Sequence, residues 1–219
     1  MNLDVLKSYI PLYNEALLLT VKIGLLGILT AFAIGLSGAA ATYFRVPVIN
    51  SILKVYIEIF RNTPLLVQLF FIYFALPKLG IRISAELCGI IGLGLIGGAY
   101  MIETMRSGLE SIAKVQSESA LSLGMTDGQV FLHIILPQAF SVSIPGIMAN
   151  VIFLLKETSV FSTISLMDLM FTAKDLIGMY AKTIECLFLL VVYYLIMLLP
   201  VSILGSIIER RVRYAEFGD

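Results

Sequence analysis

The chain has 219 residues, of which 59% are hydrophobic and only 14% carry a charge. Soluble domains carry about 25% charged residues, so a water-soluble fold of this length has too little interior to bury so much apolar surface. Basic and acidic residues are equal in number, at 15 each, and no basic tract suggests a nucleic-acid partner. A single histidine and two cysteines in apolar stretches, Cys88 and Cys186, argue against a metal cluster or a disulfide framework. We therefore expect one membrane-embedded domain over residues 1–219.

Five apolar stretches are long enough to cross a bilayer, which takes about 20 residues. They cover residues 17–43, 52–76, 87–105, 136–155 and 184–208. The first stretch is too long for the apolar part of a signal peptide, and we expect it to be retained. The apolar run 160–171 is too short to cross easily and predicts a re-entrant or tilted half-helix. Paired glycines within 92–98 predict close helix packing in the third span.

The distribution of Lys and Arg predicts the orientation of these spans. With the N-terminus outside, the inner side carries more basic residues than the outer side. The inner residues are Arg45, Lys54, Arg61, Arg106, Lys114, Arg210, Arg211 and Arg213, and the outer ones are Lys7, Lys78, Arg82, Lys174 and Lys182. We therefore expect the C-terminus and the loop 106–135 to lie in the cytoplasm.

The loop 106–135 is expected to contain a short helix over residues 114–123. Gly124 suits a left-handed C-terminal cap, and Pro137 suits the first turn of the next helix. The apolar side of this helix cannot be buried by the loop alone. It comprises Ala120, Leu121, Leu123 and Met125. The residues leave two alternatives: docking into a groove of a partner, or resting on the bilayer surface.

The same loop carries a spaced pattern that resembles a known signature. Glu118-Ser119-Ala120 is followed by three residues, Gly124, nine residues and the run Ile-x-Leu-Pro at 134–137. This is similar to the signature loop of binding-protein-dependent ABC importer permeases, and it departs only at Ser119, where the family has Ala. Segments 58–68, 99–109 and 155–159 resemble the polar amino-acid permeases of the histidine, arginine and glutamine type.

The resemblance implies an all-α integral membrane protein with about five transmembrane helices, in the MetI-like permease fold with a cytoplasmic coupling helix. It implies that this helix contacts an ATP-hydrolysing subunit through Glu118, Ser119, Ala120, Leu121 and Gly124. The implied partners are two ATP-binding subunits, a second permease copy or a paralogue, an extracytoplasmic solute-binding protein and the lipid of a bacterial cytoplasmic membrane. The chain has no G-x-x-x-x-G-K-[ST] motif, so ATP and Mg²⁺ are expected on the partner. We expect no cofactor, metal or enzymatic activity in this chain.

Charges inside the spans are costly and tend to mark function. Glu58 and Arg61 are three residues apart and can pair on one helix face. We favour a structural ion pair at the cytoplasmic gate over a substrate contact. Pro64 follows and predicts a kink.

A second group of polar residues forms the candidate substrate site. Lys156 and Glu157 precede Thr158 and Ser159, which can begin a new helix inside an interrupted one. Broken helices of this kind often form transporter sites with helix N-termini facing anions. Lys156 and the free N–H groups at Ser159 could hold the carboxylate of an amino acid.

Glu103 or Glu157 could hold the ammonium group, with Tyr100 beside Glu103. The alternative is that Lys156 and Glu103 pair across helices. Asp168 could contact a cationic side chain or lie at the outer interface, and the excess of acids weakly favours basic substrates.

The preferred function is a permease subunit of an ATP-driven importer for polar amino acids, with basic ones weakly favoured, that works by alternating access. An ion-gradient-driven secondary amino-acid transporter is the alternative, but it predicts paired repeats with matching broken helices. A membrane enzyme would need a convergent catalytic set. A purely structural membrane scaffold would not require charged residues buried at three depths in the bilayer.

Overall fold

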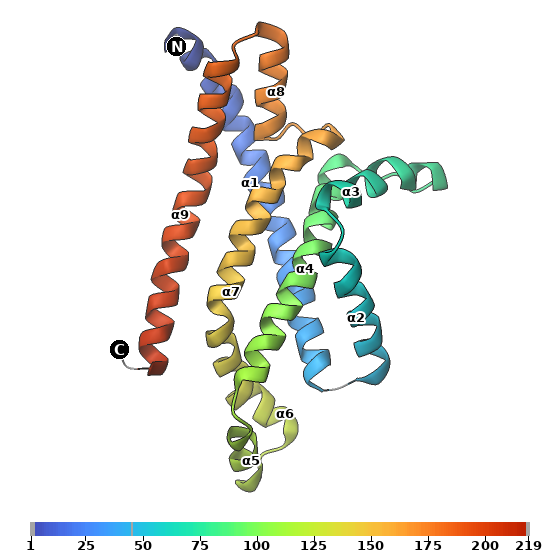
Figure 1. Ribbon diagram of the computed structural model, residues 1–219, viewed down its shortest axis with the longest axis vertical. Coiled ribbons are helices and arrows are strands. Elements are labelled where there is room, and N and C mark those ends of the chain that lie inside the picture. Colours follow the sequence, from blue (N-terminus) through green and yellow to red (C-terminus); the bar gives the residue numbers. More distant parts are fainter. Residues whose placement is uncertain (1–2, 45, 218–219) are drawn as a thin grey trace.

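The computed structural model describes residues 3–44 and 46–217, with side chains as far as Val212. Most of the described residues are helical, and none forms a strand. The long helices α1 (Leu3–Tyr43), α4 (Ala85–Ser111), α7 (Leu136–Glu157) and α9 (Thr183–Phe217) run side by side (Figure 1). Four helical segments are long and apolar enough to cross a membrane, and a bent pair of helices counts as a fifth span. This confirms the expected number of about five. The termini lie at opposite ends, called here the α8 end (N-terminal) and the α5 end (C-terminal).

The first helix is much longer than the apolar stretch 17–43 predicts, because it begins at Leu3. Its first turns pack against α8 (Leu169–Tyr180) and the start of α9, where Tyr9 and Tyr13 are buried. The hydroxyl of Tyr13 donates to the carbonyl of Cys186 at 2.7 Å. A hydropathy window misses this extension because tertiary contacts, rather than a continuous apolar run, hold it in place.

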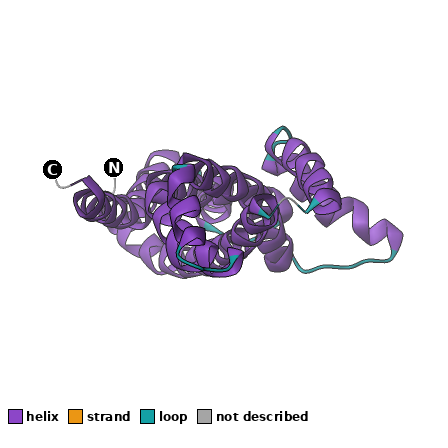
Figure 2. Ribbon diagram, turned by 90° about the horizontal axis from the view of Figure 1, so that it is seen from below, coloured by secondary structure: helices purple, strands orange, loops and turns teal. Residues whose placement is uncertain are grey.

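The second predicted span, 52–76, is broken into two helical segments, and the kink predicted at Pro64 is confirmed. α2 (Pro47–Arg61) ends before α3 (Leu65–Phe70), and the two segments meet at a bend of 102°. A π-helical turn (Phe71–Ala75) and a 3₁₀ helix (Leu76–Leu79) continue α3 sideways (Figure 2). Pro64 has no N–H to donate to a helix. Gln68 supports the break by donating to the carbonyls of Phe60 and Thr63 at 3.1 and 2.9 Å.

The segment after α7 also differs from the prediction. A new helix was expected to begin at Thr158, but α7 passes directly into a 3₁₀ helix (Thr158–Ile164). The chain breaks later, at Ser165, which has a φ of 58°, and α8 then begins at Leu169. The run 160–171 is therefore not a single half-helix.

The loop between α4 and α7 contains the expected short helix, α5 (Lys114–Ser122), and Gly124 has a φ of 85°. The turn back toward the bundle comes at α6 (Asp127–Val130), where Thr126 and Gln129 form a capping box. A π-helical turn (Phe131–Ile135) joins α6 to α7, and Pro137 lies in the first turn of α7, as predicted. The wider turn accommodates the missing N–H of that proline inside a continuous helical path.

The core lies between α1 and α4, whose backbones approach closely at glycines. A Cβ atom added to Gly27 would lie 2.6 Å from the Cβ of Leu93. One added to Gly97 would lie 2.6 Å from Leu154 on α7 and 2.7 Å from Ala31 on α1. The glycine runs therefore serve helix packing, as predicted.

Candidate substrate pathway and coupling helix

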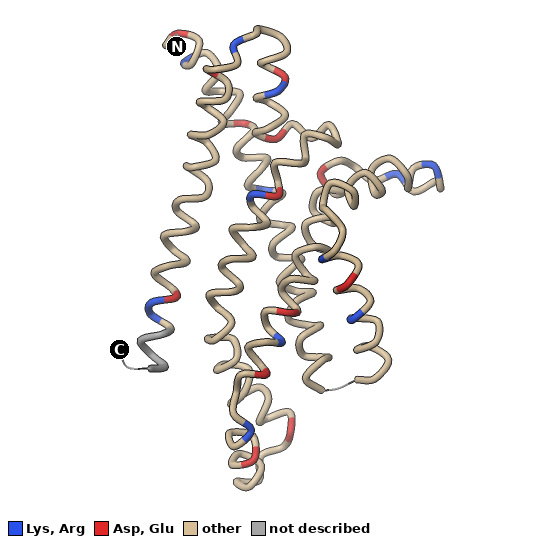
Figure 3. The backbone as a smooth tube through the Cα atoms, in the orientation of Figure 1, with Lys and Arg blue, Asp and Glu red and all other residues tan. Residues whose placement is uncertain are grey.

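The face of α4 that does not pack on α1 carries polar side chains at helical spacing. Tyr100, Glu103, Arg106 and Glu110 lie three or four residues apart and so share one face of the helix. Red and blue segments mark charged residues along this part of α4 and along α2 (Figure 3). α2 has no buried residue, and the hydroxyl of Tyr56 ties it to α4 by donating to the carbonyl of Leu95 at 2.5 Å.

Arg61 and Arg106 both bind Glu103. Nη1 of Arg61 lies 3.3 Å from Oε2 of Glu103. Arg106 binds the same carboxylate in a bidentate manner, through Nε at 3.1 Å and Nη2 at 3.2 Å. The Nη1 atom of Arg106 also donates to Oε1 of Glu110 at 2.6 Å. The Arg61 guanidinium lies over the ring of Tyr100, 5.2 Å from its centroid, in a cation–π contact.

The expected Glu58–Arg61 pair is therefore wrong. The Glu58 carboxylate instead accepts from Nδ2 of Asn62 at 3.0 Å. Arg61 reaches across to the neighbouring helix because α2 ends at Arg61 and its last turn faces α4. The cross-helix alternative of Lys156 with Glu103 is also wrong, because both arginines already hold that carboxylate.

A cavity of about 750 Å³ lies between the end of α1, α2 and α4. Its lining residues carry both signs of charge: Lys54, Glu58, Arg61, Glu103, Arg106 and Glu110, together with Thr42 and Asn50. Charged side chains at membrane depth normally face a protein interior or a water-filled cavity. This groove is therefore unsuited to lipid.

A second cavity of about 330 Å³ lies at the break between α2 and α3. Its walls include the break residues 62–66, Arg61, Tyr100 and Glu157, with Ile96, Phe153 and Val160 as apolar lining. Glu157 is half-buried and forms no hydrogen bond or ion pair with another described residue. A guanidinium and a free carboxylate thus line one small cavity whose other walls are mostly aromatic and apolar, apart from Asn62 and Thr63.

The structure separates the six candidate substrate residues. Tyr100 and Glu157 line the smaller cavity, and Glu103 lines the larger one beside it. Lys156 and Ser159 are not among the lining residues of either cavity, and Lys156 is exposed. The helix start predicted at Thr158 and Ser159 provides no free N–H groups, because α7 continues there directly as a 3₁₀ helix.

Asp168 has a structural role that the sequence did not reveal. It is fully buried, and its Oδ1 atom accepts from the backbone N–H of Phe171 at 2.9 Å, so it caps α8. Burial raises the pKa of this carboxyl to about 7, although the capping N–H groups and Lys174 oppose the rise. It lines neither cavity.

Sequence reasoning missed the roles of Arg61 and Arg106 toward Glu103, and of Phe153 as a cavity wall. The spacing of Glu103, Arg106 and Glu110 on one helix face was a signal for this network. The side-chain amide of Asn150 on α7 also donates to the hydroxyl of Thr104 at 2.9 Å, which orients α7 against α4.

The short helix α5 projects from the bundle. Glu118, Ser119 and Leu121 are exposed, and so is Gly124, whereas Ala120 is buried against Val130 and Ile135. Leu123 is 85% exposed. Only part of the predicted apolar side is thus left without cover.

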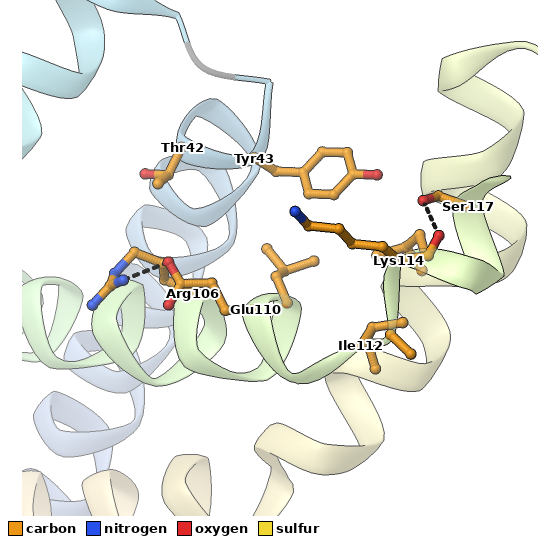
Figure 4. Close-up of a pocket in the computed structure, with 10 residues that line it drawn as sticks. Thr42, Tyr43, Arg106, Glu110, Ile112, Lys114 and Ser117 are labelled. Atoms are coloured by element: carbon orange, nitrogen blue, oxygen red, sulfur yellow. Dashed lines mark hydrogen bonds and ion pairs between the residues drawn. The ribbon is translucent and has the colours of Figure 1, made fainter.

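The base of α5 borders a third cavity, of about 310 Å³. Figure 4 shows Lys114 reaching toward Tyr43, with Arg106 and Glu110 in another part of the cavity wall. Thr42, Arg106 and Glu110 also line the larger cavity, so the two spaces adjoin.

A bundle of spanning helices, a charge-lined groove unsuited to lipid and an exposed short helix at one end define a multi-pass membrane transport component. The family described as binding-protein-dependent transport system inner membrane component matches residues 24–214. The chain belongs to this family.

Relatives and solved structures agree with this assignment. The chain is 36% identical over 206 residues to the probable amino-acid permease protein YxeN of Bacillus subtilis, covering 93% of this chain and 92% of that protein. It is 33% identical over 218 residues to the arginine transport system permease protein ArtQ of Bacillus subtilis, covering 97% and 99%.

A solved amino acid ABC transporter with histidines matches with a TM-score of 0.88 at 32% identity, over 96% of this chain and 99% of that one. The MetNI methionine ABC transporter matches at 0.78, over 97% and 99%; at 18% identity it supports the fold alone. The MetI-like fold is confirmed.

Proposed function

We propose that this chain is the permease subunit of an ATP-driven importer for polar amino acids and moves its substrate by alternating access. The observation that carries the proposal is the cavity of about 330 Å³ with Arg61 and Glu157 in its wall. Small-molecule sites have volumes of roughly 300–1,000 Å³ and combine apolar walls with a few polar groups. The two opposite charges match the carboxylate and the ammonium group of a free amino acid.

The roles in the cavity follow from the chemistry of the side chains. Arg61 binds the substrate carboxylate, because a guanidinium presents a planar pair of donors to it. Glu157 binds the ammonium group, and Tyr100 and Phe153 pack on the substrate. Arg61 thus takes the role that the sequence suggested for Lys156, which is exposed away from the cavity.

The partners are proposed from the surfaces. The exposed residues of α5 and Gly124 dock on an ATP-binding subunit, which holds ATP and Mg²⁺, and two such subunits serve two permeases. A second permease copy or a paralogue covers the charged groove between α2 and α4. A solute-binding protein delivers substrate at the α8 end, which faces outward from a bacterial cytoplasmic membrane, with the C-terminus inside. The chain acts as one domain without catalytic activity of its own.

The basic residues at the α5 end support this orientation. Lys114, Arg210 and Arg211 are at the α5 end, in agreement with an excess of cytoplasmic positive charge. Arg45 and the side chain of Arg213, which the sequence also assigned to the inner side, lie outside the described residues.

A matched pair of glycine variants tests the coupling surface. Gly124 and Gly80 both have positive φ, at 85° and 87°, and an added Cβ meets no atom within 4 Å at either. Asp adopts this backbone region more readily than most residues, and the strain is alike at the two positions, so both variants are expected to fold. Gly124→Asp is expected to lose capture of the ATP-binding subunit in detergent, whereas Gly80→Asp keeps it. Equal capture by both variants would remove α5 as the docking surface.

Uptake into proteoliposomes tests the substrate class. The complex, with its solute-binding protein, is supplied in turn with radiolabelled L-glutamine, L-arginine and L-glutamate. Uptake that requires internal ATP and is lost in Glu157→Gln supports the proposal. Uptake that follows an imposed ion gradient without ATP would instead support the secondary transporter.

A further inference from the structure

The two larger spaces at the break of α2 meet at one side chain. Arg61 lines the cavity of about 330 Å³ proposed for the substrate and also the charged cavity of about 750 Å³. The larger space adjoins the cavity at the base of α5. Arg61 therefore lies on the route from the proposed substrate site toward the α5 end.

Arg61 is held in this position by two contacts on α4. Its guanidinium lies 3.3 Å from the Glu103 carboxylate and 5.2 Å from the centre of the Tyr100 ring. The ring contact orients the guanidinium without using its N–H groups. The donors that are not bound to Glu103 are thus free to meet an anion in the smaller cavity.

Glu103 has a second partner that keeps it paired if Arg61 leaves. Arg106 already binds both oxygens of Glu103, at 3.1 and 3.2 Å. A carboxylate that loses its only cation in a poorly solvated site is destabilised strongly, but one that keeps a bidentate arginine is not. The Arg61–Glu103 contact can therefore break at small cost.

We propose that the carboxylate of the bound amino acid competes with Glu103 for Arg61, so that substrate occupancy releases the Arg61–Glu103 bridge between α2 and α4. This inference rests on the proposed function and deepens it. Arg61 contacts the substrate, and Glu103 and Arg106 are positioning residues. The bridge closes the way to the larger cavity when the site is empty and opens it when the site is filled.

The released state also has a route to the coupling helix. Glu103 turns fully to Arg106, which also binds Glu110, and both line the cavity beside Lys114. Only residues 112–113 separate α4 from α5. A rearrangement of these ion pairs therefore changes the wall of a cavity that the base of the coupling helix also lines.

The proposal predicts opposite effects for two residues that do not touch the substrate. Glu103→Gln removes the competitor for Arg61, so amino-acid affinity is expected to rise about threefold. Arg106→Gln leaves Arg61 as the only cation, among the described residues, that is bound to Glu103. Glu103 then competes more strongly for Arg61, so amino-acid affinity is expected to fall about threefold. These sizes correspond to partly exposed ion pairs worth up to about 1 kcal/mol, with tenfold per 1.4 kcal/mol. A role in folding alone would weaken binding in both variants.

The test measures equilibrium binding of radiolabelled L-glutamine, L-arginine and L-glutamate to the permease–ATPase complex in nanodiscs, without the solute-binding protein. Glu86→Gln is the control, because it breaks an exposed ion pair with Lys22, of 2.8 Å, that borders neither cavity. Arg106→Lys keeps one charge and is expected to restore part of the affinity lost in Arg106→Gln. ATP hydrolysis without substrate is measured in parallel and is expected to rise in Glu103→Gln.

Opposite shifts in the two variants, with the control unchanged, support the proposal. Shifts in the same direction, or none, overturn it while wild-type binding leaves the proposed function in place. If the wild-type complex binds none of the three amino acids, both the proposed function and this inference fail.

Discussion

The two faces of α4 are built in opposite ways. Toward α1, glycines let the backbones approach until side chains interlock, and the contact is apolar apart from the exposed Lys22–Glu86 pair. Toward α2, the same helix presents Glu103, Arg106 and Glu110 to a cavity of about 750 Å³. Interlocked side chains resist displacement. Ion pairs across a hydrated groove can exchange partners at little cost. The α1–α4 contact is therefore a fixed seam, whereas the face of α4 toward α2 can rearrange.

The seam between α1 and α4 is expected to tolerate substitution worst. A Cβ atom at Gly35 would overlap the Cβ atom of Met101 and would lie 3.3 Å from its carbonyl carbon. Overpacking of this kind costs about 1–3 kcal/mol for small additions, and Gly35→Val adds three carbons. We expect loss of the monodisperse protein in size-exclusion chromatography.

The control for this prediction is Gly178→Val on α8, where an added Cβ meets no atom within 4 Å. It is expected to keep the elution profile of the wild type. A stable Gly35→Val protein would show that the seam is not closely packed.

Substitutions on the charged face of α4 toward α2 are expected to change transport and to leave folding stability nearly unchanged. Arg61→Gln removes the proposed carboxylate ligand, so uptake is expected to fall by about tenfold or more, in line with a charged hydrogen bond worth roughly 1.5–3 kcal/mol. Its thermal unfolding temperature should stay close to that of the wild type, because Glu103 keeps Arg106. Uptake assays and thermal unfolding of the same preparation measure both quantities.

Lys22→Gln on α1 is the matched control, since Lys22 pairs with Glu86 away from the cavities. Normal uptake by Arg61→Gln would exclude it from the site. A large fall in its unfolding temperature would assign it to the fixed part of the structure.

The sequence predicted the seam better than the groove, for physical reasons. Glycine spacing and hydropathy are local patterns, and they correctly gave close packing in α4, the number of spans and the short helix α5. The partner of Arg61 depends on where α2 ends relative to α4. The bend of 102° at Asn62–Pro64 sets this position, and spacing along one helix could not show it.

The error at Lys156 has a similar origin. Its charge and the following Thr158 and Ser159 indicated a helix start, but the chain continues as a 3₁₀ helix and breaks at Ser165 instead. Propensity gives the types of residue that can cap a helix. Tertiary contacts decide which of these residues caps a helix, and in this segment the buried Asp168 caps α8.

The aromatic contact of Arg61 gives a smaller effect on the charged face. Tyr100→Leu removes the ring beneath the guanidinium, and a cation–π contact is worth about 0.5–1 kcal/mol at a partly exposed site. Amino-acid affinity in nanodiscs is expected to fall about two- to fivefold. Tyr100→Phe keeps the ring and should bind like the wild type. Equal losses in both variants would assign the effect to the hydroxyl instead.

The smallest effect is expected at Asp168, which belongs to neither face of α4. Its pKa is raised from 3.8 to about 7 by burial, and its titratable or charged neighbours are Lys174 on α8 and Tyr194 on α9. Between these two pH values the folded state holds a proton that the unfolded state has lost. Stability therefore falls as the pH rises toward 7 and is then constant with respect to this group.

Asp168→Asn keeps an N-cap side chain but cannot ionise. The variant should lose this slope and unfold at a higher temperature than the wild type at pH 8, measured by thermal unfolding from pH 5 to 8. An identical pH profile in both proteins would show that the buried carboxyl does not titrate in this range.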